Sequence, residues 1–167
     1  MIKQISFILF LALLFCSCTA PQYIWPQKDI GYNEINQPDL EKKILIASRK
    51  SEFKGEIVQR IENAFQNRIV YIKFIGIEDL EYEDANQYSV VVLINTAMGW
   101  KIDRKVESFL DRRGEMNSII VLTTSYGGDI LPDTEEHQVD AISSASVKDD
   151  SEHIANKIIT KINNLIK

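Results

Sequence analysis

The sequence predicts a three-layer α/β domain built on a parallel five-stranded sheet. From residue 42 onward, short apolar segments alternate with segments whose apolar residues recur every three to four positions, which is typical of strands alternating with helices. The segments 90–94 and 119–122 are apolar at every position, as expected for strands buried on both faces. The segment 69–75 instead alternates apolar and polar residues, which indicates an edge strand.

The first strand and helix are predicted between residues 44 and 65. Residues 44–48 form a short, mainly apolar run, as in a buried strand. Phe53, Ile57, Ile61 and Phe65 then recur every four residues and form one apolar face of a helix. These two elements begin the alternation that continues to the end of the chain.

The middle of the chain repeats the same alternation of elements. Strands are expected at 69–75, 88–95 and 118–124, where Val, Ile and Leu dominate. Between the last two, an apolar face around 106–110 marks a helix, and Gly114 can end it by adopting a left-handed conformation.

The last strand has the weakest pattern, because only 139–142 offers a short apolar stretch. No clear helical pattern occurs between residues 129 and 150, so we expect one connecting helix to be reduced to a loop. Ser151 can cap a final helix. Its apolar face comprises Ile154, Ala155, Ile158, Ile159, Ile162 and Ile166.

The contrast between strands predicts their order. The segment 69–75 carries Tyr71 and Lys73 between its apolar residues, so we place it at the edge of the sheet. The other main strands lie inside. This arrangement fits the order 2-1-3-4-5 of a doubly wound sheet, in which ligands bind at the carboxyl ends of the strands.

The N-terminal residues predict export and lipidation. Lys3 is followed by an apolar run from 5 to 15 that is shorter than the roughly 20 residues of a membrane-spanning helix, as in a signal peptide. The run ends at Ser17-Cys18, which resembles a bacterial lipobox. We therefore expect a signal peptide at 1–17 and lipidation of Cys18 by acyl chains such as palmitate. The mature protein would be anchored outside the cytoplasm, on the periplasmic face or the cell surface of a bacterium.

Residues 18–41 are predicted to be a tether before the domain at 42–167. This segment holds three of the four prolines and shows no sustained period. It also carries the apolar residues Tyr23, Ile24, Trp25, Ile30, Tyr32 and Ile35. We expect these to pack along the domain, and contact with lipid or a protein partner is the alternative.

Composition argues against several classes of ligand. The formal net charge of −5 disfavours nucleic-acid binding, which needs a basic face. The two cysteines are Cys16, which cleavage would remove, and Cys18, which acylation would modify. With only two histidines besides, we expect neither a disulfide nor a metal site.

Residues 42–167 resemble the flavodoxin-like family. The segment 88–96, followed by Gly99-Trp100 and by Val106 to Leu110, is similar to a flavodoxin strand, aromatic loop and helix. The segment 120–129 is similar to the next strand and its Gly-bearing aromatic loop. The resemblance implies a flavodoxin-like fold.

The resemblance also implies an FMN site at the carboxyl ends of the strands. The phosphate would lie in the loop 48–53, held by Ser48 and Ser51, with Arg49 and Lys50 attracting it by charge. The ring would stack near Trp100 (or Met98) and Tyr126, beside Gly127. The rim would comprise 48–53, 98–100, 125–129 and 143–146.

Two functions remain open from the sequence. The first is a membrane-anchored electron carrier that binds FMN. The second is an adaptor that binds a protein partner and has lost its phosphate loop. Glu52 and Phe53 favour the adaptor, since they bring a negative charge and a bulky ring to the place where a phosphate should lie.

Overall fold

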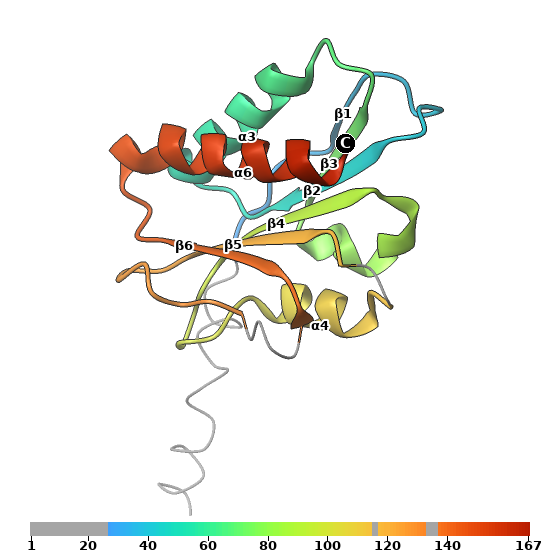
Figure 1. Cartoon of the computed structure of the whole chain (residues 1–167). Helices are drawn as coiled ribbons and strands as arrows, with labels where there is room; N and C mark the ends of the chain where they lie inside the picture. Colours follow the sequence, from blue (N-terminus) through green and yellow to red (C-terminus); the bar gives the residue numbers. More distant parts are fainter. Residues whose placement is uncertain (1–26, 115–116, 133–136) are drawn as a thin grey trace, which may run out of the picture.

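The computed structural model describes residues 27–114, 117–132 and 137–167 as a three-layer α/β fold (Figure 1). Its elements, in chain order, are β1 (Asn33–Ile35), β2 (Lys43–Ser48), α3 (Glu52–Phe65), β3 (Tyr71–Gly76), the 3-10 turns η1 (Glu78–Tyr82) and η2 (Ala85–Gln87), β4 (Val90–Thr96), α4 (Arg104–Arg112), β5 (Ile119–Thr124), β6 (Asp140–Ser144), the 3-10 turn η3 (Lys148–Asp150) and α6 (Ser151–Leu165).

The described strands form one sheet in the order β1-β3-β2-β4-β5-β6. The strands from β2 to β6 are parallel, and β1 alone runs antiparallel. The predicted order of the five parallel strands, 2-1-3-4-5, is confirmed. The short, weakly patterned last strand is also present, as β6 beside β5.

Two apolar cores fill the spaces on either side of the sheet. Alternate residues of β2 point to opposite faces, so Ile44 and Ile46 pack under α3 and α6, whereas Leu45 and Ala47 pack under α4 and η1. Figure 1 shows α3 and α6 on one side and α4 on the other. The strands that are apolar at every position are those covered on both faces.

The predicted edge position of the 69–75 segment is wrong. Its strand, β3, pairs with β2 on one side and with β1 on the other, where Asn33 lies opposite Phe74. The polar residue that suggested an edge, Lys73, has its own partner, because its Nζ lies 2.7 Å from a carboxylate oxygen of Glu83. Its place in the pattern reflects an ion pair and not exposure at the end of the sheet.

The folded unit begins earlier than residue 42. Residues 33–35 form β1, and Ile30 and Ile35 pack against the core under α3, as expected for these two residues. Two other expectations concern the cap of the last helix and the connection between β5 and β6. Ser151 begins α6 but donates its hydroxyl hydrogen bond to Glu56 and does not cap the helix. Residues 133–136 of the β5–β6 connection, where no full helix was expected, lie outside the described residues.

Candidate functional site: a pocket at the carboxyl ends of the strands

A pocket of about 500 Å³ lies where β2, β4 and β5 end and α3 begins. The loop after β2 leads directly into α3, so the N-terminus of a 14-residue helix forms part of the wall. Free N–H groups at such a terminus favour anions. The lining residues are Gln27, Lys28, Lys50, Ser51, Glu52, Phe53, Lys54, Thr96, Thr124, Ser146 and Lys148.

Lys54 is the most unusual residue of this pocket. It is 4% exposed, and its Nζ donates a hydrogen bond of 2.6 Å to Thr96 Oγ1 at the end of β4. Burial lowers the pKa of Lys54 to about 8, and the positive charge of Arg49 adds to the effect. Within the described residues Lys54 has no ion pair, so a buried ammonium faces the pocket without a counter-charge.

The three residues before Lys54 at the start of α3 all have other partners, so none of them pairs with the Lys54 ammonium. Ser51 caps the helix, its Oγ accepting from Lys54 N at 3.2 Å. Glu52 is exposed and pairs with Lys148 at 2.6 Å. Phe53 turns inward, where it is 5% exposed and packs in the core under α3. The negative charge of Glu52 is therefore neutralised and the ring of Phe53 is buried, so neither residue opposes a phosphate in the pocket.

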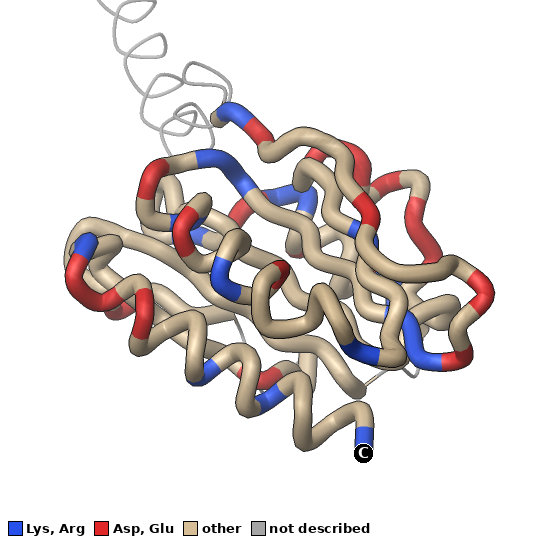
Figure 2. The backbone as a smooth tube through the Cα atoms, turned by 90° about the horizontal axis from the view of Figure 1, so that it is seen from above, with Lys and Arg blue, Asp and Glu red and all other residues tan. Residues whose placement is uncertain are grey.

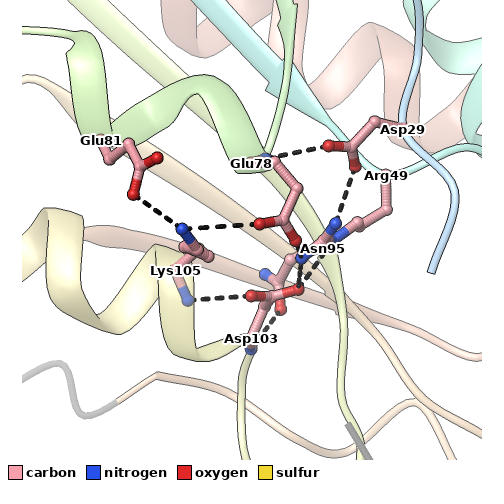
Figure 3. Close-up of polar contacts among 7 residues, drawn as sticks. All are labelled: Asp29, Arg49, Glu78, Glu81, Asn95, Asp103 and Lys105. Atoms are coloured by element: carbon pink, nitrogen blue, oxygen red, sulfur yellow. Dashed lines mark hydrogen bonds and ion pairs between the residues drawn. The ribbon is translucent and has the colours of Figure 1, made fainter. Parts of the chain in front are cut away.

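Arg49, expected to attract phosphate, is committed elsewhere (Figure 3). Its guanidinium contacts Asp29 at 2.9 Å, Glu78 at 2.8 Å and Asp103 at 2.7 Å. Burial opposes the charge of Arg49, but these carboxylates outweigh burial and raise its pKa. With three carboxylates around it, the Arg49 guanidinium links segments that are far apart in the sequence, and its N–H groups are not available to a ligand.

The Arg49 cluster fixes the loop between β4 and α4. Asp103 accepts from Lys105 N at 2.9 Å and so caps α4, and its own N–H donates to Asn95 Oδ1 at 3.2 Å. Asn95 in turn donates to Leu122 O and Thr123 Oγ1, both at 3.1 Å. This chain of contacts ties the ends of β2, β4 and β5 together at the side of the pocket.

The segment before β1 forms the remaining wall of the pocket. Lys50 N donates to Lys28 O at 2.7 Å, and Ile30 N donates to Ser48 O at 3.2 Å. Between these bonds, Asp29 pairs with Arg49 and lies against Gly76, where an added Cβ would come within 2.5 Å of Asp29 Oδ2. Residues once assigned to a tether thus contribute to the site.

The pocket brings together only some of the predicted site residues. Ser51 lines it, but Ser48 is fully buried and its hydroxyl donates to Arg49 O at 2.8 Å. Gly127 packs beside Asp129, while the left-handed conformation falls on Gly128, whose missing Cβ makes room for the backbone of Ala145. Cys18 lies outside the described residues.

The two aromatic residues assigned to a flavin ring are not part of the pocket lining. Trp100 occupies a tight turn closed by Met98 N donating to Lys101 O, and its φ of 61° is a left-handed conformation that is uncommon for a tryptophan. Its side chain is 88% exposed, and Tyr126 is fully exposed. Both loops follow neighbouring parallel strands, β4 and β5, so both aromatic residues lie at the carboxyl edge.

Sequence reasoning missed Lys54, Thr96 and Thr124. A signal for Lys54 was present, because it lies three residues before Ile57 and seven before Ile61, on the buried stripe of α3. A lysine at such a position must either find a buried partner or face a cavity. The two threonines gave no comparable signal, since hydroxyl residues are common at strand ends.

Comparison with known proteins supports the fold. No known family matches the sequence, and neither does any curated protein. Among solved structures, a flavodoxin from the domain Archaea aligns with a TM-score of 0.52 at 10% identity, over 75% of this chain and 99% of that one. Flavodoxin 2 from Bacillus cereus aligns with a TM-score of 0.48 at 15% identity, over 73% of this chain and 99% of that one. An azoreductase from Bacillus anthracis aligns with a TM-score of 0.41 at 9% identity, over 72% of this chain and 96% of that one.

The archaeal flavodoxin shows that this chain has a flavodoxin-like fold, as the resemblance of 42–167 implied. In the described part of the chain, no group of three or more His, Cys, Asp or Glu side chains is placed to hold a metal ion. None of the helices described is long and apolar enough to cross a membrane.

Proposed function

We propose that this protein is a lipid-anchored, extracytoplasmic binding protein that holds the phosphate group of a small molecule in the pocket beside Lys54. The observation that carries the proposal is the buried Lys54 ammonium, whose only side-chain partner among the described residues is Thr96. A bound phosphate would supply the missing counter-charge, and the N-terminus of α3 would add N–H donors. Thr124 and Ser146 offer further hydroxyls from the same wall.

FMN is the first ligand to test. The fold is flavodoxin-like, and a phosphate beside Lys54 would leave a ring to lie along the ends of β4 and β5. Bound FMN would make the protein an electron carrier, because a flavin accepts and returns electrons. The adaptor function is favoured by a different observation, namely that Trp100 and Tyr126 are exposed and outside the pocket lining.

Titration with FMN, riboflavin and inorganic phosphate tests the phosphate site. We expect FMN to bind at least about tenfold more tightly than riboflavin, which corresponds to about 1.4 kcal/mol. Lys54→Met should remove that difference, and Lys50→Met, a change at an exposed lysine of the same pocket, should reduce it only in part. Equal affinity of the wild type for FMN and riboflavin would contradict a role for Lys54 in phosphate binding. If none of the three compounds binds, the phosphate-binding function is ruled out and the adaptor function takes its place.

The lipid anchor has an independent test. Mass spectrometry of the protein extracted from membranes should show a mature chain that begins at Cys18 and carries diacyl or triacyl modification. A mature chain that starts at another residue, or an unmodified Cys18, would rule out the anchor while leaving the phosphate site untouched.

A further inference from the structure

We infer that the carboxyl edge of the sheet, carrying Trp100 and Tyr126, docks onto the surface of an anionic lipid bilayer. The inference rests on the lipid anchor proposed above. It assigns to these two side chains a role at the membrane in place of ring stacking. Three independent features of the described residues lead to it.

The first feature is the position at which the described chain starts. Gln27 lines the pocket at the carboxyl edge, and it lies nine residues after Cys18. Nine residues span at most about 30 Å even when fully extended. A lipid on Cys18 therefore keeps this edge of the domain within one short segment of the bilayer, whereas the opposite edge is farther by the length of the strands.

The second feature is the kind of apolar side chain exposed at this edge. Trp100 is 88% exposed and Tyr126 fully exposed, and Val147, just after β6, is half exposed. Tryptophan and tyrosine are the residues that favour the level of the lipid headgroups. The left-handed turn at Gly99 and Trp100 holds the indole away from the domain at a cost in backbone energy. A membrane surface gives that exposed ring a partner.

The third feature is the charge of the same edge. Lys28, Lys50 and Lys101 have no ion pair among the residues that the structure describes. Most nearby acids are already engaged in ion pairs, since Asp29, Glu78 and Asp103 contact Arg49, Glu78 also contacts Lys105, and Glu52 pairs with Lys148. In Figure 2, acidic and basic segments are interspersed over the fold, and basic segments lie close to the start of the described chain. Lysines without an ion pair at the same edge as exposed aromatic residues are suited to anionic headgroups.

The test uses the full-length lipidated protein in vesicles of phosphatidylethanolamine and phosphatidylglycerol, with tails of the second lipid brominated. In a Trp25→Phe background, Trp100 is the only indole. Its emission should shift to the blue and fall roughly twofold in brominated vesicles, as expected for a ring at the headgroup boundary. Raising the salt concentration, or making Lys28→Glu and Lys101→Glu together, should restore most of the emission.

The matched control places the indole at the other edge. Ile69 is 85% exposed just before β3, so Ile69→Trp in a Trp25→Phe, Trp100→Phe background carries an equally exposed ring at the amino ends of the strands. Its emission should not change with brominated lipid. Equal quenching of both indoles, or of neither in protein that floats with the vesicles, overturns the docking. Protein that fails to float overturns the anchor as well.

Discussion

Replacing Lys54 by methionine should make the protein more stable while removing its affinity for phosphate. The folded state holds this lysine with a pKa of about 8, against an ordinary value of 10.5. Each pKa unit corresponds to about 1.4 kcal/mol, so keeping the ammonium charged at pH 7 costs the folded state about 3 kcal/mol. The hydrogen bond to Thr96 returns about 1 kcal/mol of this. Methionine fills a similar volume without a charge, and the net gain should be about 2 kcal/mol.

The pH dependence of this gain follows from the same pKa. Below pH 8 the lysine is charged in both the folded and unfolded states, and the full penalty is present. Between about pH 8 and 10.5 the unfolded chain binds the proton and the folded chain has lost it, so the stability of the wild type rises with pH. The advantage of Lys54→Met should therefore be largest near pH 7 and shrink towards pH 10.

Thermal melts at pH 7 and pH 10 measure both effects. A gain of about 2 kcal/mol raises the melting temperature by roughly 4 to 8 °C in a chain of this size. Lys50→Met, at the exposed lysine of the same pocket, is the control and should leave the melting temperature nearly unchanged. A Lys54→Met variant that melts below the wild type at pH 7 would refute the reasoning, since the lysine would then be stabilised by contacts other than those described.

Four further outcomes follow from the same contacts. Phosphate affinity of the wild type should fall as pH rises through about 8, where Lys54 loses its proton, and an affinity that stays constant across this range would exclude Lys54 as the binding group. Arg49→Met leaves the buried Asp103 without its partner and should cost about 3 kcal/mol in urea denaturation; a neutral result would mean that the cluster adds nothing to stability. Gly76→Ala pushes a methyl group into Asp29 and should cost about 1 to 3 kcal/mol by the same assay. Val92→Asp buries an unpaired carboxylate in the centre of the sheet, and circular dichroism should show an unfolded chain.

The parallel strands and their order could be predicted because they depend on patterns local to each segment. Segments 90–94 and 119–122 are apolar throughout, and such a strand must be covered on both faces. The extra strand β1 could not be predicted in this way. It has three residues, Asn33–Ile35, with no apolar alternation, and its position depends on contacts with a strand far along the chain. Missing β1 also produced the wrong edge, because Lys73 was assigned to solvent when its partner was Glu83.

A pocket lies at the predicted position of the candidate site, and only some of the predicted residues line it. The rule that ligands bind at the carboxyl ends of the strands located the pocket, and Ser51 lines it. Arg49 was assigned to the phosphate because its three carboxylate partners, Asp29, Glu78 and Asp103, lie far from it in the sequence. Lys54 was missed although its place on the buried face of α3 was a signal. Whether FMN binds stays a prediction that the titration decides.

The antiparallel contact between the N-terminal segment and the loop after β2 has a mechanical consequence. A pull on the chain from its N-terminal side first loads the backbone bonds of Lys28 and Ile30 and the pair between Asp29 and Arg49. Breaking these contacts removes Gln27 and Lys28 from the pocket and leaves the parallel sheet intact. With the proposed lipid on Cys18, tension between the bilayer and the domain would open the pocket before it unfolds the sheet, and the proposed ligand would be released at lower loads than the sheet withstands.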